Sequence, residues 1–143
     1  MLVTTRGRYA LQVMIDLAEH YNGRCIPVKD IAKRQELSIK YLEHILPVLS
    51  KNDLISGIHG KGGGYRLNRA PEKYKVGEIL RAVEGGLVPV SCLNESGISC
   101  SEDPDNKTVM KMWSDFYKLT NDYFDSITIA DLIKSDTAFD YFI

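Results

Sequence analysis

A chain of 143 residues is long enough to bury a hydrophobic core in one ordinary domain, so disulfide bonds are not required for folding. Hydrophobic residues make up 44% and charged residues 26% of the chain, as in typical globular proteins, and no apolar run approaches the roughly 20 residues of a membrane helix. The composition therefore excludes a membrane-spanning protein and a small disulfide scaffold.

The net charge of −1 conceals an uneven distribution along the chain. Residues 1–75 carry 13 Lys and Arg against 7 Asp and Glu, whereas residues 76–143 carry 5 against 12. A basic half beside an acidic half indicates that the first half binds a polyanion and that the second does not.

The amino terminus and the cysteines both favour a cytoplasmic protein. Residues 1–6 lack the basic region, apolar stretch and small-residue cleavage site of a signal peptide. The odd number of cysteines suits a reducing compartment, in which thiols are free, metal-bound or redox-active. The three residues are Cys25, Cys92 and Cys100.

The first two predicted helices lie in residues 1–35. Apolar residues at spacings of three and four predict a helix that is capped by Thr4 or Thr5 and runs to about Tyr21, before Gly23. Pro27 ends an extended connector, and a short helix over residues 28–35 follows it.

The third predicted helix begins at Ser38, a good N-cap residue. Pro47 predicts a kink in this helix, because proline cannot donate a backbone hydrogen bond to the carbonyl of Glu43. The inner face consists of apolar side chains at helical spacing: Leu42, Ile45, Leu46 and Leu49.

A glycine-rich hairpin follows the third helix. Residues 54–58 and 65–67 are β-prone and are separated by residues 59–64, which contain four glycines. A fourth helix is expected over residues 76–84. Three helices followed by such a hairpin predict a mainly α fold with a small β-hairpin wing, the winged helix-turn-helix, whose third helix lies in the DNA major groove.

The carboxyl-terminal region is predicted to form a long helix followed by a short one. The long helix carries more aromatic and aliphatic residues than one domain core needs, so we expect it to pack against the same helix of a second copy. The expected interface residues are Val109, Met112, Trp113, Phe116, Tyr123 and Ile127. Thr128 and Asp131 form a capping box that opens a short helix through Ile133.

The chain is therefore expected to divide into three parts. Residues 1–86 form the winged helix-turn-helix DNA-binding domain, residues 87–106 form a loop that contains Cys92 and Cys100, and residues 107–143 form the dimerisation helix and tail.

The outer edge of the third helix supplies the candidate base-reading residues. Lys40 can donate to guanine, Glu43 can accept from cytosine, and His44 can donate to a purine or a phosphate. A carboxylate facing DNA repels phosphate, so Glu43 is expected to contribute specificity rather than affinity.

Other basic residues are candidates for contacts with phosphate, which give affinity without sequence information. They are Arg6, Arg8, Lys33, Arg34, Lys51, Lys61, Arg66 and Arg69. At the wing tip, His59 and Lys61 are flanked by glycines that permit close approach to a groove or the backbone.

The chain resembles the Rrf2 family of bacterial transcription regulators over nearly its whole length. The resemblance rests on residues 5–10 (TRGRYA), 30–32 (DIA), 38–43 (SIKYLE), 60–65 (GKGGGY), 77–79 (GEI), Trp113 and 125–128 (DSIT). It implies a homodimer that binds double-stranded DNA at a roughly palindromic operator, with base reading by Lys40, Glu43 and His44. It also implies wing contacts by His59 and Lys61. We further expect Arg6, Arg8 and Tyr41 to contact DNA, and we expect a repressor.

The resemblance also bears on sensing. Members that bind a [2Fe–2S] or [4Fe–4S] cluster use three cysteines in the loop before the long helix. Here Cys92 and Cys100 lie in that loop, but Lys107 stands at about the position of the third cysteine. Two thiolates do not complete a four-ligand site. A cluster completed by other groups, a reversible disulfide and inert cysteines therefore remain alternatives.

Cys25 is a further candidate redox thiol, since some members without a cluster carry a thiol in this region, although a buried packing role is the commoner one for cysteine. We expect the effector to be a small molecule or a protein.

Two other classes of function compete with DNA binding. A winged-helix module that binds protein through its acidic half would lack the steep salt dependence of phosphate contacts. A thiol or metal enzyme is disfavoured, because the sequence has no C-x-x-C, no nucleophile elbow and no G-x-G-x-x-G after a strand. We therefore expect no enzymatic activity.

Overall fold

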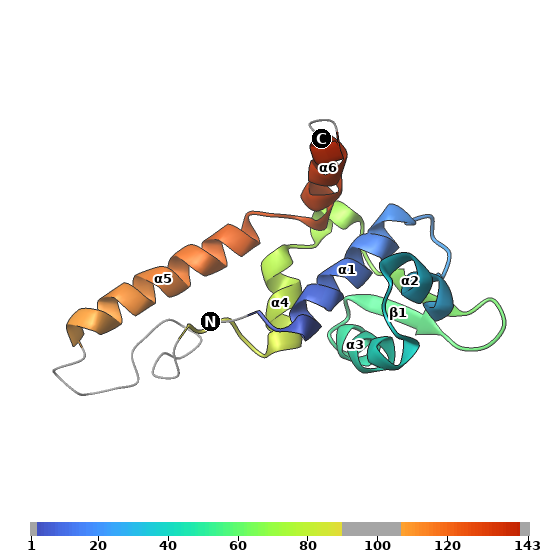
Figure 1. Ribbon diagram of the computed structural model, residues 1–143, viewed down its shortest axis with the longest axis horizontal. Helices are drawn as coiled ribbons and strands as arrows, with labels where there is room; N and C mark the ends of the chain where they lie inside the picture. Colours follow the sequence, from blue (N-terminus) through green and yellow to red (C-terminus); the bar gives the residue numbers. More distant parts are fainter. Residues whose placement is uncertain (1–2, 90–106, 141–143) are drawn as a thin grey trace.

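The computed structural model describes residues 3–89 and 107–140 of the chain. Helices α1 to α4 and the hairpin gather into one body, from which α5 extends as a long rod (Figure 1). The helices are α1 (Thr5–Glu19), α2 (Val28–Gln35), α3 (Ile39–Lys51), the short 3₁₀ helix η1 (Pro71–Lys73), α4 (Val76–Glu84), α5 (Lys107–Asp125) and α6 (Ile129–Asp140), and the strands are β1 (Ile55–Ile58) and β2 (Gly64–Leu67).

The predicted fold class is confirmed. The two strands form an antiparallel hairpin in which Ile55 pairs with Leu67 and Ile58 with Gly64. This hairpin follows three helices, as in a winged helix-turn-helix. Ser38 caps α3 as expected, because its side chain accepts a hydrogen bond from the backbone N–H of Tyr41 at 3.1 Å.

Two local predictions, the ends of the first and of the last helix, need correction. The first helix ends at Glu19, and Tyr21 lies beyond it with 47% of its surface exposed. In between, Pro47 lies inside α3, which continues to Lys51. Pro47 has no backbone N–H to donate to the carbonyl of Glu43. Both residues lie on the exposed face of α3, so water can take the place of the missing donor. The last helix runs to Asp140 rather than to Ile133.

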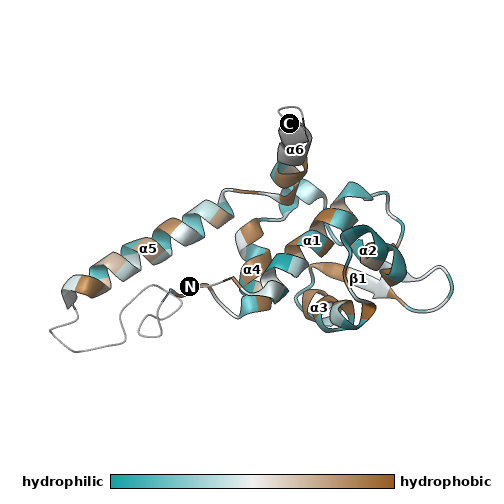
Figure 2. Ribbon diagram, viewed as in Figure 1, coloured by the Kyte–Doolittle hydropathy of each residue, from teal (hydrophilic) through white to brown (hydrophobic). Residues whose placement is uncertain are grey.

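The hydrophobic core forms where the inner faces of the helices meet. Its main cluster joins apolar side chains of α1, α2 and α3 with those of both strands, α4 and Ile129 of α6. A smaller cluster of Val76, Leu80 and Leu87 receives Phe124 and Ile127 from the end of α5 and the link that follows it. Figure 2 shows hydrophobic residues on the body helices and also along the rod α5.

A buried carboxylate fixes α2 against α1. Asp16 is completely buried, and the guanidinium of Arg34 donates to both of its oxygens at 2.9 Å. The side-chain amide of Gln35 donates to the same carboxylate at 3.1 Å. The bond to Asp16 raises the pKa of Arg34 above its usual value. Since α2 leads directly into α3, this arrangement positions the helix-turn-helix.

The base of the wing is held by Tyr74, which is fully buried. Its hydroxyl donates to the carbonyl of Leu54 at 2.6 Å and accepts from the backbone N–H groups of Asn68 at 2.9 Å and Arg69 at 3.1 Å. One phenol thus joins the start of β1 to the end of β2.

Candidate nucleic-acid interface

The outer edge of α3 presents the predicted base-reading side chains to solvent. Lys40, Glu43 and His44 are exposed, whereas the four apolar residues of the inner face are buried. The turn between α2 and α3 places Glu36 in the left-handed conformation, with φ of 54°, which ends α2 and redirects the chain. The polar edge is therefore free to face a duplex.

Ile39 was not among the predicted site residues, yet it is 48% exposed in the first turn of α3. An apolar side chain next to Lys40 can pack against the methyl group of thymine, which is the apolar feature of the major groove. The sequence could have indicated this exposure, because Ile39 follows the N-cap Ser38 directly and lies outside the stripe of buried residues.

The amino terminus of α1 lies beside α3. Arg6 and Arg8 are exposed, while Tyr41 is half-buried with its ring edge-on to that of Tyr9 at 5.1 Å between ring centroids. A groove of about 330 Å³ is lined by Thr4, Thr5, Arg6, Tyr41, Val83 and Glu84. Arg6 and Tyr41 thus share one surface.

Glu84 ties α4 to the start of α1. Its carboxylate accepts hydrogen bonds from the backbone N–H of Thr4 at 3.0 Å and from the Thr4 hydroxyl at 2.7 Å. A negative charge at a helix amino terminus is favourable. This end of α1 is therefore already neutralised within the protein, and phosphate contacts there fall to the arginine side chains.

The wing is anchored to the connector between α1 and α2. Ile26 and Tyr65 exchange two backbone hydrogen bonds, of 2.8 Å and 2.9 Å. Gly64 permits this approach, because its φ is +140° and a Cβ there would lie 2.1 Å from the carbonyl oxygen of Ile26. His59 and Lys61, beyond this anchor, are both exposed.

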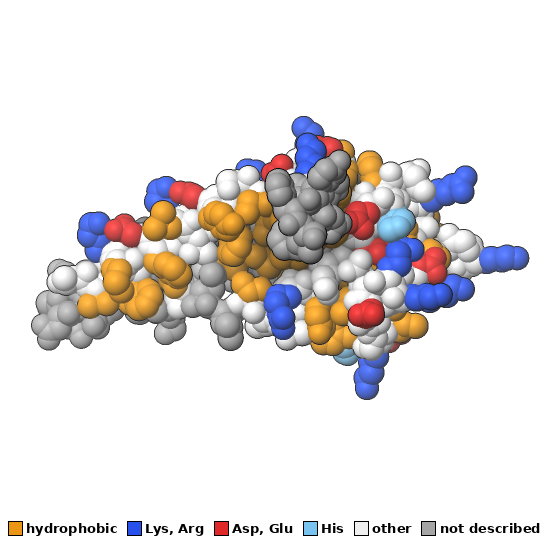
Figure 3. All heavy atoms as spheres, turned by 45° about the horizontal axis from the view of Figure 1, so that its top comes forward, with side chains coloured by type: hydrophobic (Ala, Val, Ile, Leu, Met, Phe, Trp, Pro, Cys, Tyr) orange, Lys and Arg blue, Asp and Glu red, His pale blue; other side chains and the backbone are white. Residues whose placement is uncertain are grey.

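Two of the arginines predicted to contact phosphate form ion pairs with carboxylates of the protein itself. Arg34 holds the buried Asp16, and Arg69 donates to Glu78 at 2.7 Å while lying 4.3 Å from the centre of the Tyr74 ring. The bond to Glu78 raises the pKa of Arg69. In Figure 3, many of the other basic side chains project from the end of the molecule formed by α2, α3 and the wing.

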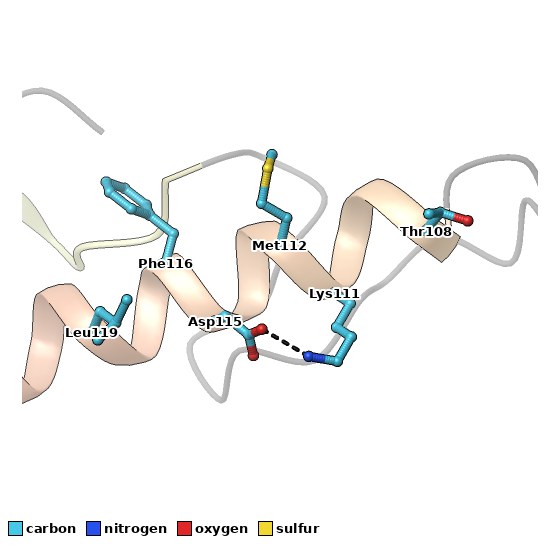
Figure 4. A pocket seen from close by; sticks show the side chains of 6 residues that line it. All are labelled: Thr108, Lys111, Met112, Asp115, Phe116 and Leu119. Atoms are coloured by element: carbon cyan, nitrogen blue, oxygen red, sulfur yellow. Dashed lines mark hydrogen bonds and ion pairs between the residues drawn. The ribbon is translucent and has the colours of Figure 1, made fainter.

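Helix α5 carries an exposed apolar stripe. The exposed fraction is 46% at Val109, 53% at Met112, 43% at Phe116, 70% at Leu119 and 62% at Tyr123. These residues follow one another at alternating spacings of three and four, the pattern of a seam between two paired helices. Met112 and Phe116 point to the same side of α5, whereas Lys111 and Asp115 pair on another side (Figure 4).

The composition of this stripe differs from the prediction at two residues. Leu119, the most exposed member, was missed, although the strict alternation of three and four would have found it. Ile127 was expected at the interface, but it lies beyond the end of α5 and packs against Val76 and Leu80 of its own chain. Trp113 is half-buried and contacts Phe116 edge-on, with 6.3 Å between the ring centroids.

The candidate sensing cysteines are separated in the chain. Cys25 is half-buried with a free thiol in the connector that pairs with the wing. Cys92 and Cys100 lie outside the described residues. Within residues 3–89 and 107–140, three or more Cys, His, Asp or Glu side chains do not come together as a metal site.

An exposed polar edge on the second helix of a helix-turn-helix, a wing beside it and arginines at one flank define a winged-helix DNA-binding protein. The comparison with known families agrees. The Rrf2 family model, described as an iron-dependent transcriptional regulator, matches residues 3–135. The chain therefore belongs to the Rrf2 family.

The similarity to individual relatives covers most of this chain and most of each relative. The HTH-type transcriptional regulator IscR of Erwinia tasmaniensis is 33% identical over 94% of this chain and 80% of the relative. The structure of CymR, the global cysteine regulator of B. subtilis, has a TM-score of 0.78 and 31% identity, and covers 94% of this chain and 98% of CymR. IscR of T. potens has a TM-score of 0.76 and 36% identity, and covers 95% of this chain and 88% of that protein.

These similarities make the chain a DNA-binding transcription regulator. They give no support to a winged-helix module that binds only protein, and the relatives are named as regulators rather than as enzymes. Among the described residues, every helix is too short or too polar to cross a membrane.

Proposed function

We propose that this regulator acts as a homodimer that binds a palindromic operator, with one α3 helix in each of two successive major grooves. The exposed stripe on α5 is the main support for the dimer. At 1.5 Å per residue the 19 residues of α5 extend about 28 Å. Its apolar side chains face solvent along most of that length, and pairing with a second copy would remove them from water.

We infer that Lys40, Glu43 and His44 read base edges, while Arg6 and Arg8 contact phosphate. Tyr41, which shares a groove with Arg6, is a further DNA contact, and the wing residues His59 and Lys61 reach the neighbouring groove or backbone. The observation that carries this assignment is the joint exposure of the three reading side chains on the first two turns of α3. In helix-turn-helix proteins these turns meet the bases.

Replacing Glu43 by alanine tests base reading. We expect the variant to bind its operator but to lose discrimination at one base pair of each half-site, by about 1–3 kcal/mol, because only a cytosine donor offsets the repulsion between the carboxylate and phosphate. The measurement is fluorescence anisotropy at fixed salt, on duplexes selected from a random pool by the wild type and then varied one pair at a time.

The matched control for this experiment is Glu36→Ala, which removes an exposed carboxylate from the turn before α3. This variant should keep the wild-type preference at every position. If Glu43→Ala keeps it as well, Glu43 does not read bases.

We propose that the regulator represses transcription in the cytoplasm and responds to iron–sulfur, redox or cysteine status through Cys92 and Cys100. The description of the family as iron-dependent and the role of CymR as a cysteine regulator support this class of signal. Cys25 is a second candidate thiol, since its connector pairs with β2 and its oxidation would act on the wing.

The residues of this chain do not by themselves fit a [2Fe–2S] cluster. Such a cluster needs four ligands, and the loop supplies two thiolates. Lys107, where a third cysteine would be expected, begins α5, and an ammonium group has no lone pair to offer a metal. A reversible disulfide between Cys92 and Cys100 needs no further ligand, and an oxidant that takes up two electrons and two protons would form it, so it is the second alternative.

Restoring the third cysteine tests the proposed role of this position. After anaerobic reconstitution with iron and sulfide, Lys107→Cys should show visible charge-transfer absorbance and bound iron clearly above the wild-type level. The same change combined with Cys92→Ser should abolish the gain, because too few thiolates then remain. Equal iron content in Lys107→Cys and the wild type would contradict the assignment of Lys107 to the ligand position.

A further inference from the structure

A polar cluster fastens the dimer helix to the DNA-binding body. Arg81 of α4 donates from Nη2 to the carboxylate of Asp125 at 2.7 Å, and from Nη1 to the side-chain carbonyl of Asn121 at 2.9 Å. Both acceptors lie in the last turns of α5. Asn121 is itself oriented, because its amide nitrogen donates to the carbonyl of Tyr117 at 2.9 Å. We name Arg81, Asn121 and Asp125 the α4–α5 clamp.

The clamp leaves little room for adjustment. A Cβ added to Gly77, one turn before Arg81, would lie 2.1 Å from the carboxylate oxygen of Asp125 and 3.0 Å from the Arg81 guanidinium. Glycine at this position therefore lets the end of α5 approach α4 closely. The side chains of Arg81 and Asp125 are 35% and 34% exposed, so the ion pair is partly shielded from solvent.

The clamp lies where α5 leaves the DNA-binding body. Phe124 and Ile127 pack beside it, whereas the apolar stripe runs from Tyr123 outward to Val109, away from the body (Figure 1). With the two rods paired, any rotation of the body about the clamp moves α3 and the wing relative to the partner's, because the clamp joins the body to the rod.

We propose that the α4–α5 clamp sets the distance between the two recognition helices, and thereby determines which spacing of operator half-sites the dimer accepts. This inference rests on the proposed dimer through α5. The clamp residues touch neither bases nor the partner helix in this scheme. They act by fixing the angle at which each DNA-binding body leaves the paired rods.

The test compares Arg81→Met with the matched control Lys118→Met. Lys118 also pairs with an aspartate, Asp122, but both of these residues lie on the exposed surface of α5. The probe is the duplex that the wild type selects from a random pool, remade with the spacer between half-sites lengthened or shortened by one base pair, and as an isolated half-site. Affinities are measured by anisotropy, and the dimer is monitored by sedimentation.

For the wild type and for Lys118→Met, two correctly spaced half-sites should bind about a hundredfold tighter than one, and changing the spacer should remove most of that gain. For Arg81→Met, two half-sites should bind only about tenfold tighter than one, and this ratio should vary less than threefold between spacers. The affinity for an isolated half-site should be unchanged. Gly77→Ala, which displaces Asp125 without removing a charge, should behave in the same way.

A wild-type spacing profile in both Arg81→Met and Gly77→Ala would overturn the inference and leave the dimeric regulator intact. An equal loss of affinity for the isolated half-site would also overturn it, since the effect would then lie in the DNA-binding body. If the wild type itself binds paired and isolated half-sites equally well, the proposed dimeric recognition fails, and the role of the clamp fails with it.

Discussion

The double variant Phe116→Asp, Leu119→Asp should be a folded monomer that binds the operator about a hundredfold more weakly than the wild type. Both side chains lie on the exposed stripe of α5, where they are 43% and 70% accessible in the single chain. Their replacement should leave the body of the protomer intact but place carboxylates in the seam between two rods. Burying unpaired charges there is costly, so the dimer should dissociate.

Sedimentation gives the oligomeric state of this variant, circular dichroism its fold, and anisotropy its affinity for DNA. Lys118→Asp is the matched control, because it introduces the same side chain at a position of α5 outside the apolar stripe. The control should remain dimeric. A double variant that still sediments as a dimer would show that the stripe on α5 is not the interface.

The substitution Asp16→Ala should lower the free energy of unfolding by about 2–3 kcal/mol. Removing one partner of a buried ion pair commonly costs 3–5 kcal/mol, and the expected loss here is smaller because the Arg34 side chain is 36% exposed and water can solvate it. Gln35 also loses its acceptor. Because these bonds fix α2 on α1, binding to the operator should weaken even where the variant is folded.

Urea denaturation of Asp16→Ala and of the matched control Asp122→Ala measures this effect. Asp122 forms an ion pair with Lys118 on the surface, with 64% of its side chain exposed, so the control should change stability by less than about 0.5 kcal/mol. Equal stability of the two variants would mean that the buried carboxylate does not hold the helix-turn-helix together.

Local signals in the sequence predicted the helices and their starting points. Ser38 caps α3, and the box of Thr128 and Asp131 forms in both directions, with two hydrogen bonds of 3.0 Å. The backbone bond from Thr128 lowers the pKa of Asp131. The expected range of residues 76–84 coincides with α4. Such features involve residues three or four apart, so the sequence alone is enough to place them.

The long-range polar contacts were not predictable in the same way. Arg34 and Arg69 carry the same charge as Arg6 and Arg8, yet the first two are held by carboxylates of their own chain and the last two are exposed. Nothing in the local pattern distinguishes them. The difference depends on which helix the fold brings within about 3 Å of each guanidinium.

By itself, the sequence determined the winged helix-turn-helix, the edge of α3 that faces outward and the apolar character of α5. Periodicity and capping encode these features within one element. Only the tertiary structure decided that Asp16 holds α2, that Tyr74 closes the base of the wing and that Arg81 fastens α5. These contacts join residues 18, 20 and 44 positions apart, and their partners are chosen by packing rather than by spacing.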